Sequence, residues 1–185
     1  MRLLLTIFLL GLTVLKAIAQ TKTAMSSPAT PVVAALSSPM RTYALRLAPG
    51  QDLRQQLQVF AQANQIKAAT IVTGVGSLTT VKLRLANQPG PTEYKGHFEV
   101  VSLVGTLSIN GSHLHLAVAD STGRTIGGHL VDGNLVYTTM ELVVGVLEEL
   151  DFRRETDPVS TYQELVVYPA DHKAKKARQN KSPKP

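Results

Sequence analysis

The sequence contains no cysteine. This absence excludes disulfide bonds, thiolate zinc sites, cysteine nucleophiles and a lipid-modified N-terminal cysteine. Aromatic residues are scarce, at 5%, whereas 44% of the 185 residues are hydrophobic and 17% are charged. This balance is typical of one globular domain and not of a disordered or fibrous chain. Without cysteine, histidine is the residue type to examine for metal chemistry.

Positive charge dominates the chain as a whole but not its central part. The formal net charge is +6, from 19 Lys and Arg residues and 13 Asp and Glu residues. Residues 171–185 contribute +5, and Arg2, Lys16 and Lys22 contribute +3, which leaves −2 for residues 23–170. Because DNA binding depends on clustered Lys and Arg, this slightly acidic body leaves any such role to the tail.

The N-terminus has the pattern of a secretory signal peptide. Arg2 precedes an apolar run, Leu3–Leu15, and Ala17-Ile18-Ala19 follows as a cleavage site of small residues. The alternative, an uncleaved anchor, is disfavoured because the run falls short of the ~20 residues needed to span a bilayer. We therefore expect residues 1–19 to be a signal peptide and the mature protein to be exported, either to the periplasm or as a secreted protein. Residues 20–40, rich in Ser, Thr, Ala and Pro, are expected to be a flexible linker.

The C-terminus, residues 170–185, is expected to be a disordered basic tail. It has six basic residues and no large apolar residue, so it cannot bury enough surface to offset its ordering entropy. Two roles stay open for it. It either contacts an anionic surface, such as a membrane or DNA, or only solubilises the protein.

Residues 41–169 are expected to form an α+β domain. Leu53, Leu57 and Phe60 recur at helical spacing and predict one amphipathic helix over residues 52–64. From residue 68 onward, short β-branched and apolar runs separated by Gly, Asn and Pro predict strands. We expect strands near residues 42–47, 69–75, 78–86, 94–108, 112–119, 124–131, 135–147 and 162–167. The prediction is a meander of mostly antiparallel strands with one early helix.

Residues 112–131 predict a hairpin whose register can be read from the sequence. Apolar and polar residues alternate after Ser112, so His113 and His115 share one face of a strand. Residues 120–124, Asp-Ser-Thr-Gly-Arg, are typical of a three-residue hairpin loop closed by a left-handed glycine. Pairing residue 120 with residue 124 sets His115 opposite His129 and places the leucines on the other face.

Three histidines, His113, His115 and His129, are therefore predicted to share one face of this hairpin. Directly opposed side chains have Cβ atoms ~4.5–5.5 Å apart, and Zn–N bonds are ~2.0–2.1 Å long, so one divalent ion could be bound by all three. Zinc is the expected metal, with one coordination position left open. The alternative is that these are ordinary half-buried strand histidines. His97 and His172 are not assigned as ligands.

Several motifs together resemble the PPC domain, named for plants and prokaryotes. The motifs are Thr73–Ser77, Gly96–Leu103, Gly105, His113–His115, Gly127–Leu130 and Glu141. The resemblance covers roughly residues 41–168. It implies a compact homotrimer in which His113, His115 and His129 can hold a metal such as zinc. In plants such domains follow a DNA-binding AT-hook, and Gly96–Val101 looks like the plant segment associated with partner contacts.

The chain departs from the plant members of that family. It has no AT-hook of the Arg-Gly-Arg-Pro type, its body is net acidic, and it carries an export pattern. Because fold analogy alone is a weak argument for function, DNA binding is the alternative hypothesis and not the leading one.

Two carboxylates, Glu141 and Glu99, are the acid/base candidates should the protein be an enzyme. Glu141 lies in an apolar strand, where an unpaired carboxylate is costly. It is interpreted either as an acceptor for a ligand histidine or general base beside a metal-bound water, or as half of a structural ion pair, for example with Arg84.

The leading hypothesis is an exported, homotrimeric PPC-like protein whose three-histidine metal site binds a small ligand. Whether it is an enzyme is left open. The alternatives are a DNA-binding protein that acts through the basic tail and a trimeric scaffold without catalysis.

Overall fold

The structure is a computed structural model that describes residues 35–171. The elements are β1 (Met40–Leu47), α1 (Leu53–Ala63), β2 (Ala69–Arg84), β3 (Thr92–Ser108), β4 (Gly111–Ala119), β5 (Thr125–Leu130), β6 (Leu135–Leu147), β7 (Leu150–Thr156) and β8 (Gln163–Pro169). The expected signal peptide, most of the expected linker and nearly all of the basic tail lie outside the described residues. Within residues 35–171 no helix is long and apolar enough to cross a membrane.

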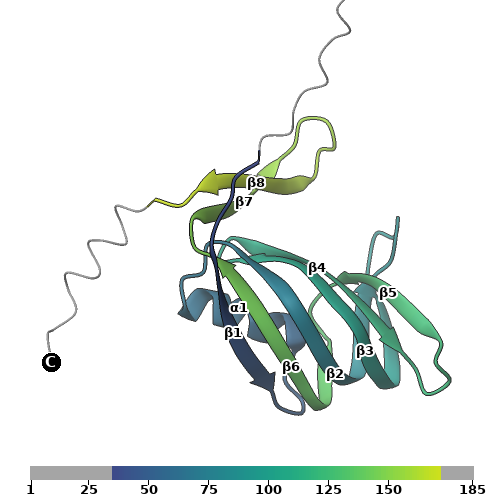
Figure 1. The fold of residues 1–185 in the computed structure, drawn as a ribbon. Coiled ribbons are helices and arrows are strands. Elements are labelled where there is room, and N and C mark those ends of the chain that lie inside the picture. Colours follow the sequence, from purple (N-terminus) through teal and green to yellow (C-terminus); the bar gives the residue numbers. More distant parts are fainter. Residues whose placement is uncertain (1–34, 172–185) are drawn as a thin grey trace, which may run out of the picture. The chain divides into compact units, whose positions relative to one another are not determined.

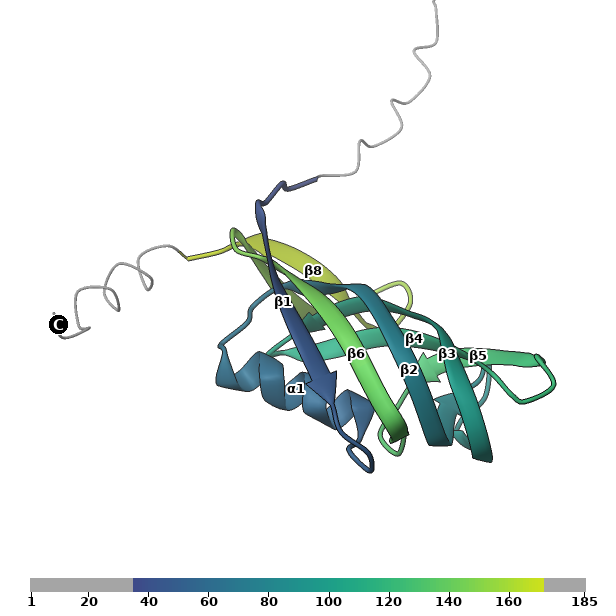
Figure 2. The same cartoon turned by 60° about the horizontal axis from the view of Figure 1, so that its bottom comes forward.

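Helix α1 begins after Asp52 and ends before Asn64, as predicted. The Asp52 carboxylate caps it, because one oxygen accepts from the Gln55 backbone N–H at 3.0 Å. Its other oxygen accepts from the Gly133 N–H, which ties the helix start to the segment before β6. Leu53 and Leu57 are almost fully buried, so the apolar face of the helix packs on the sheet (Figure 2).

Six strands form one sheet in the order β1-β6-β2-β3-β4-β5, and every pairing in it is antiparallel (Figure 1). β2 also pairs with β5 at its C-terminal end, so β2, β3, β4 and β5 form a closed ring of paired strands. The predicted meander is wrong in one respect, because β6 is inserted between β1 and β2 instead of following β5 at the edge. Local residue patterns identify a strand but do not specify which distant strand it pairs with.

The core lies on the face of the sheet covered by α1. Leucines, valines and a methionine from the six strands are buried there, in one cluster with the helix. They include Leu78, Leu83, Leu107, Leu114, Leu116, Leu130, Val118, Val136 and Met140. The alternate residues of these strands point to the opposite face, which carries the histidines.

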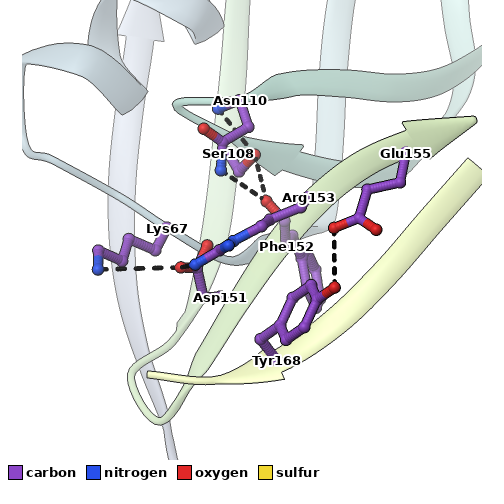
Figure 3. A network of polar contacts seen from close by, with 8 residues as sticks. All are labelled: Lys67, Ser108, Asn110, Asp151, Phe152, Arg153, Glu155 and Tyr168. Atoms are coloured by element: carbon purple, nitrogen blue, oxygen red, sulfur yellow. Dashed lines mark hydrogen bonds and ion pairs between the residues drawn. The ribbon is translucent and has the colours of Figure 1, made fainter. Parts of the chain in front are cut away.

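A separate two-stranded sheet pairs β7 with β8. β8 was expected near residues 162–167, whereas β7 was not predicted, because the charged side chains of Asp151 and Arg153 interrupt its apolar pattern. The hairpin is anchored at its base by Phe152, which is buried. The Phe152 carbonyl accepts from Ser108 Oγ at 3.3 Å and Asn110 Nδ2 at 2.8 Å (Figure 3).

Candidate metal centre

The β4–β5 hairpin has the register predicted from the sequence. His115 is the direct partner of His129, and Leu116 and Val118 are the partners of Gly128 and Ile126. Leu116 and Val118 are buried in the core, so the histidines project from the other face. The hydrophobic pattern therefore determines which side of the hairpin carries the imidazoles.

The loop of this hairpin is also as predicted. Gly123 adopts a left-handed conformation, with φ of 81°, and its N–H donates to the Asp120 carbonyl at 2.9 Å. The Asp120 carboxylate accepts from the backbone N–H of Thr122 at 2.9 Å and of Arg124 at 3.1 Å. The Thr122 hydroxyl also donates to this carboxylate, at 2.6 Å, and this bond, followed by the backbone bonds, lowers the pKa of Asp120 and assigns it to turn chemistry.

His113, His115 and His129 converge on one point. Each offers a ring nitrogen, and these three nitrogens lie within 4.8 Å of one another. The ring centroids are 5.1 Å apart for His113 and His115, 4.9 Å for His113 and His129, and 5.6 Å for His115 and His129. No other group of metal-ligating side chains of this size is found in residues 35–171.

The donor atoms fit a metal ion. The two Nε2 atoms of His113 and His115 are 3.2 Å apart, close to the roughly 3.3 Å that separates two ligands of a tetrahedral zinc with Zn–N bonds of ~2.05 Å. The Nδ1 atom of His129 is buried without a hydrogen-bond partner. A buried polar atom without a partner is costly, and such atoms call for an explanation such as an ion. The cluster therefore suits three-histidine coordination.

Burial keeps two of these imidazoles neutral. Desolvation, with smaller contributions from His113 and Arg84, lowers the pKa of His129 to about 4. Desolvation, followed by the positive charge of Arg154, also lowers the pKa of His113. Neutral imidazole is the form that binds metals, so both residues are ready to bind at neutral pH without releasing a proton.

The two carboxylates proposed from the sequence do not lie with the triad. Glu141 is exposed on β6, where it is paired with Arg46 of β1 and Val75 of β2. Val75 is nine positions along β2 from Arg84, the neighbour of His129, which is roughly 30 Å of extended strand. Within the described residues no ion pair joins Glu141 to Arg84, so the interpretation as that ion pair is wrong: the carboxylate faces solvent and needs no buried partner.

Glu99 is likewise exposed, on β3. Its partner on β4 is Ala119, whereas His115 pairs with Val104, five positions further along β3. The structure thus gathers the three histidines and leaves both acid/base candidates elsewhere on the sheet. His97 is separate too, because it packs against Tyr137 with ring centroids 4.4 Å apart. His172 lies outside the described residues.

Three charged residues near the triad were not found by sequence reasoning. Arg84 of β2 is the direct partner of His129. Arg154 of β7 donates to Thr106 Oγ1 at 3.0 Å, and Thr106 is the direct partner of His113. Glu164 of β8 acts on His113 in the opposite sense, since its negative charge raises the pKa of that imidazole. Each of these three residues lies near the triad because of contacts between distant segments, which local sequence patterns do not predict.

Comparison with known proteins identifies relatives of this chain. The bifunctional protein GlmU of Synechococcus sp. (strain JA-3-3Ab) is 47% identical over 128 residues, which cover 69% of this chain and 21% of that protein. The AT-hook motif nuclear-localized protein 13 of Arabidopsis thaliana is 31% identical over 115 residues, which cover 56% of this chain and 26% of that protein. The chain therefore spans only about a quarter or less of the length of these relatives.

Solved structures share the fold. A hypothetical protein from Salmonella enterica aligns with a TM-score of 0.73 and 48% identity over 74% of this chain and 99% of that one. A metal-containing protein from Archaeoglobus fulgidus aligns with a TM-score of 0.64 and 23% identity over 72% of this chain and 99% of that one. The model of the Plants and Prokaryotes Conserved (PCC) domain matches residues 35–148. Because this match covers more than half of the chain, the protein belongs to the Plants and Prokaryotes Conserved domain family, the PPC family that its motifs resemble.

Proposed function

We propose that this protein binds one divalent metal ion, zinc, through His113, His115 and His129 and uses the remaining coordination position for a small ligand. The observation that carries the proposal is the convergence of three imidazole nitrogens within 4.8 Å on one face of the β4–β5 hairpin. The metal-containing relative from Archaeoglobus fulgidus, which shares the fold, supports it. A zinc ion bound there would supply a Lewis-acidic centre to an oxygen ligand.

Ligand binding is favoured over catalysis by what surrounds the triad. Neither Glu99 nor Glu141 is placed to move a proton at a ligand held there. Within residues 35–171, Glu164 is a carboxylate whose charge acts on His113, and its Oε1 accepts a hydrogen bond from the Ser160 hydroxyl at 3.2 Å. Within the described residues, the direct strand partners of the histidines include no carboxylate that could act as a general base. The proposed role of this site is therefore to hold and orient a ligand.

Metal content of the purified full-length protein tests this proposal. We expect about one zinc per chain by elemental analysis, and loss of that zinc in His115→Ala and His129→Ala. His97→Ala is the matched control, since His97 is also an exposed strand histidine but stacks on Tyr137 away from the triad. A wild-type protein that stays metal-free after incubation with zinc would refute the metal site.

The proposed assembly is a homotrimer. It is supported by an apolar patch on the two strands β2 and β3, where Val72, Val75, Val101 and Val104 are 49%, 57%, 59% and 54% exposed. Val104 is the direct partner of His115, so this patch borders the histidines. Exposed apolar patches of this kind often mark interaction surfaces.

Light scattering on the eluting protein measures the assembly. We expect the mass of three chains for the wild type and of one chain for Val101→Glu. Val59→Glu is the control, because Val59 is 55% exposed on α1, away from these strands. Equal masses for the two variants would contradict the proposed interface.

Export is proposed from the N-terminal pattern alone, which lies outside the described residues. The N-terminal sequence of the protein isolated from its source cells tests it. A mature chain that begins at Gln20, recovered from outside the cytoplasm, supports export, and an intact Met1 in the cytoplasm contradicts it.

A second candidate function is DNA binding, which the Arabidopsis relative's AT-hook name suggests. In this chain it would depend on the basic residues of 171–185. It requires an affinity for duplex DNA that falls steeply with salt and disappears when these residues are deleted. Absent or salt-insensitive binding rules it out.

A further inference from the structure

Arg84 lies in the same transverse row of the sheet as two of the histidines. The register pairs Arg84 of β2 with His129 of β5, and His129 with His115 of β4. Directly paired residues of antiparallel strands project from the same face, with neighbouring strands ~4.8 Å apart. The Arg84 side chain therefore starts beside the triad, on the face from which the imidazoles project.

The guanidinium of Arg84 has no carboxylate partner. The residue is exposed, and in the described part of the chain its side chain takes part in no ion pair and no hydrogen bond. Several of the other arginines do have acidic partners, such as Arg54, which is 2.6 Å from Asp132. Five donor N–H groups in a planar fork are thus left available next to the histidines.

A second arginine stands on the other side of the triad. Arg154 is positioned by its bond to Thr106, the partner of His113. Arg84 through its pairing with His129, and Arg154 through its bond to the partner of His113, place two positive charges beside the cluster. A divalent ion held by the three imidazoles would add two more positive charges there, and no ion pair of the described residues neutralises either arginine. The site with its metal is therefore short of negative charge.

The space beside the histidines is not filled by the hairpin itself. The next pair along β4 and β5 on this face is Ala117 and Gly127, which are the smallest side chains available. A Cβ at Gly127 would lie 3.2 Å from the backbone carbonyl oxygen of Leu116, which is a tight contact. The small pair therefore adds little side-chain bulk over the hairpin beside the triad.

We propose that Arg84 is an anion-recognition residue and that the ligand of the histidine site is a small molecule bearing a carboxylate or phosphate group. The acid group takes a bidentate hydrogen bond from the Arg84 guanidinium and supplies the negative charge that the metal and the two arginines require. This inference rests on the proposed metal site and adds the chemical class of its ligand. It also accounts for a cationic side chain that lies beside a cation-binding cluster.

The test follows anion binding to the full-length protein in two states, metal-free and loaded with cobalt(II) in place of zinc. The probes are acetate and inorganic phosphate, titrated separately, so that the two acid groups are distinguished. The visible spectrum of cobalt reports anions at the metal, and the Arg84 side-chain N–H resonances report anions at the guanidinium. We expect at least one anion to perturb both signals.

Arg84→Gln is the informative variant, because it removes the charge and the guanidinium fork and leaves a polar side chain at an exposed position. We expect it to retain one cobalt per chain and to bind the anion at least about tenfold more weakly. Arg46→Gln is the matched control, as Arg46 is an exposed strand arginine on β1, opposite Glu141. Its anion affinity should equal that of the wild type.

The outcomes separate this inference from the metal site. If cobalt binds but neither anion does, or if Arg84→Gln and Arg46→Gln bind anions equally, Arg84 is not a recognition residue and the metal site stands. If cobalt does not bind, the metal site falls, and the Arg84 resonances in the metal-free protein then decide whether the arginine binds anions. No shift of these resonances would overturn the inference as well.

Discussion

Substituting Gly105 by alanine should damage both the stability of the protein and the proposed metal site. Gly105 lies in β3 opposite Leu114, with φ of +133°, a conformation that L side chains rarely adopt. A Cβ there would overlap the carbonyl oxygen of the ligand His113 and lie 2.9 Å from Leu114 Cα. Both contacts are with backbone, so β4 itself would have to move.

The loss of stability can be divided into two parts with a control on the β3–β4 hairpin. Gly111, at the start of β4, has a similar φ of +121°, but nothing lies within 4 Å of its Cβ position. Gly111→Ala therefore measures backbone strain alone, about 1–3 kcal/mol. Gly105→Ala adds the displacement of a packed strand, about 1–3 kcal/mol more.

The assay is urea-induced unfolding of the metal-free protein, followed by zinc titration of each folded variant. We expect the free energy of unfolding to fall by about 2–6 kcal/mol for Gly105→Ala, which exceeds the loss for Gly111→Ala. Zinc affinity should fall only for Gly105→Ala, because only that substitution displaces β4, which carries His113 and His115. Equal losses of stability in the two variants, with unchanged zinc affinity, would refute the reasoning.

Three further predictions follow from the contacts described. The pKa of His129 is about 4 in the folded protein and ~6.5 in the unfolded chain, so the unfolded metal-free chain binds more protons between these values. The free energy of unfolding should therefore fall by about 1–2 kcal/mol, after allowance for solvent screening, as the pH drops from 6.5 to 4. Urea unfolding at a series of pH values should show a weaker pH dependence of this free energy in His129→Gln. Asn134→Ala should lower the free energy of unfolding by about 2–4 kcal/mol, since its fully buried amide accepts from the backbone N–H of Lys82 and donates to the carbonyls of Lys82 and Val131. Asn110→Ala should cost less, because the Phe152 carbonyl that loses the Asn110 bond still accepts from the Ser108 hydroxyl. Phe152→Ala should lower the free energy of unfolding by about 3 kcal/mol and speed hydrogen exchange in β7 and β8. It should leave zinc at one per chain. Loss of zinc would instead show that the β7–β8 hairpin supports the triad.

The histidine triad could be predicted because its geometry is almost entirely local. Alternation places His113 and His115 on one face, and a three-residue loop with a left-handed glycine fixes the partner of each strand residue. The helix could be predicted equally well, since Asp52 is a capping residue directly before an apolar helical pattern. In each case the information lies within about 20 consecutive residues.

The missed features depend on contacts between distant segments. The insertion of β6 between β1 and β2 joins residues 55 to 107 positions apart, and either edge of an apolar strand satisfies the same local pattern. Glu141 was interpreted as a buried carboxylate because its neighbours are apolar, but one face of β6 is open, so the side chain is exposed. The strand β7 was missed because its charged residues form contacts that only the fold supplies, such as those of Asp151 with Lys67 and Arg153 (Figure 3).

The family was identified from the resemblance of its motifs, and the antiparallel α+β class and the face and register of the three histidines were predicted from local patterns. Class, face and register follow from side-chain periodicity and turn chemistry, which act over a few residues. The surroundings of the histidines, in contrast, depend on the three-dimensional fold. It brought Arg84 beside His129 and Arg154 beside His113 while leaving Glu99 and Glu141 elsewhere, because strand pairing over long separations is selected by the packing of the whole core and not by any one segment.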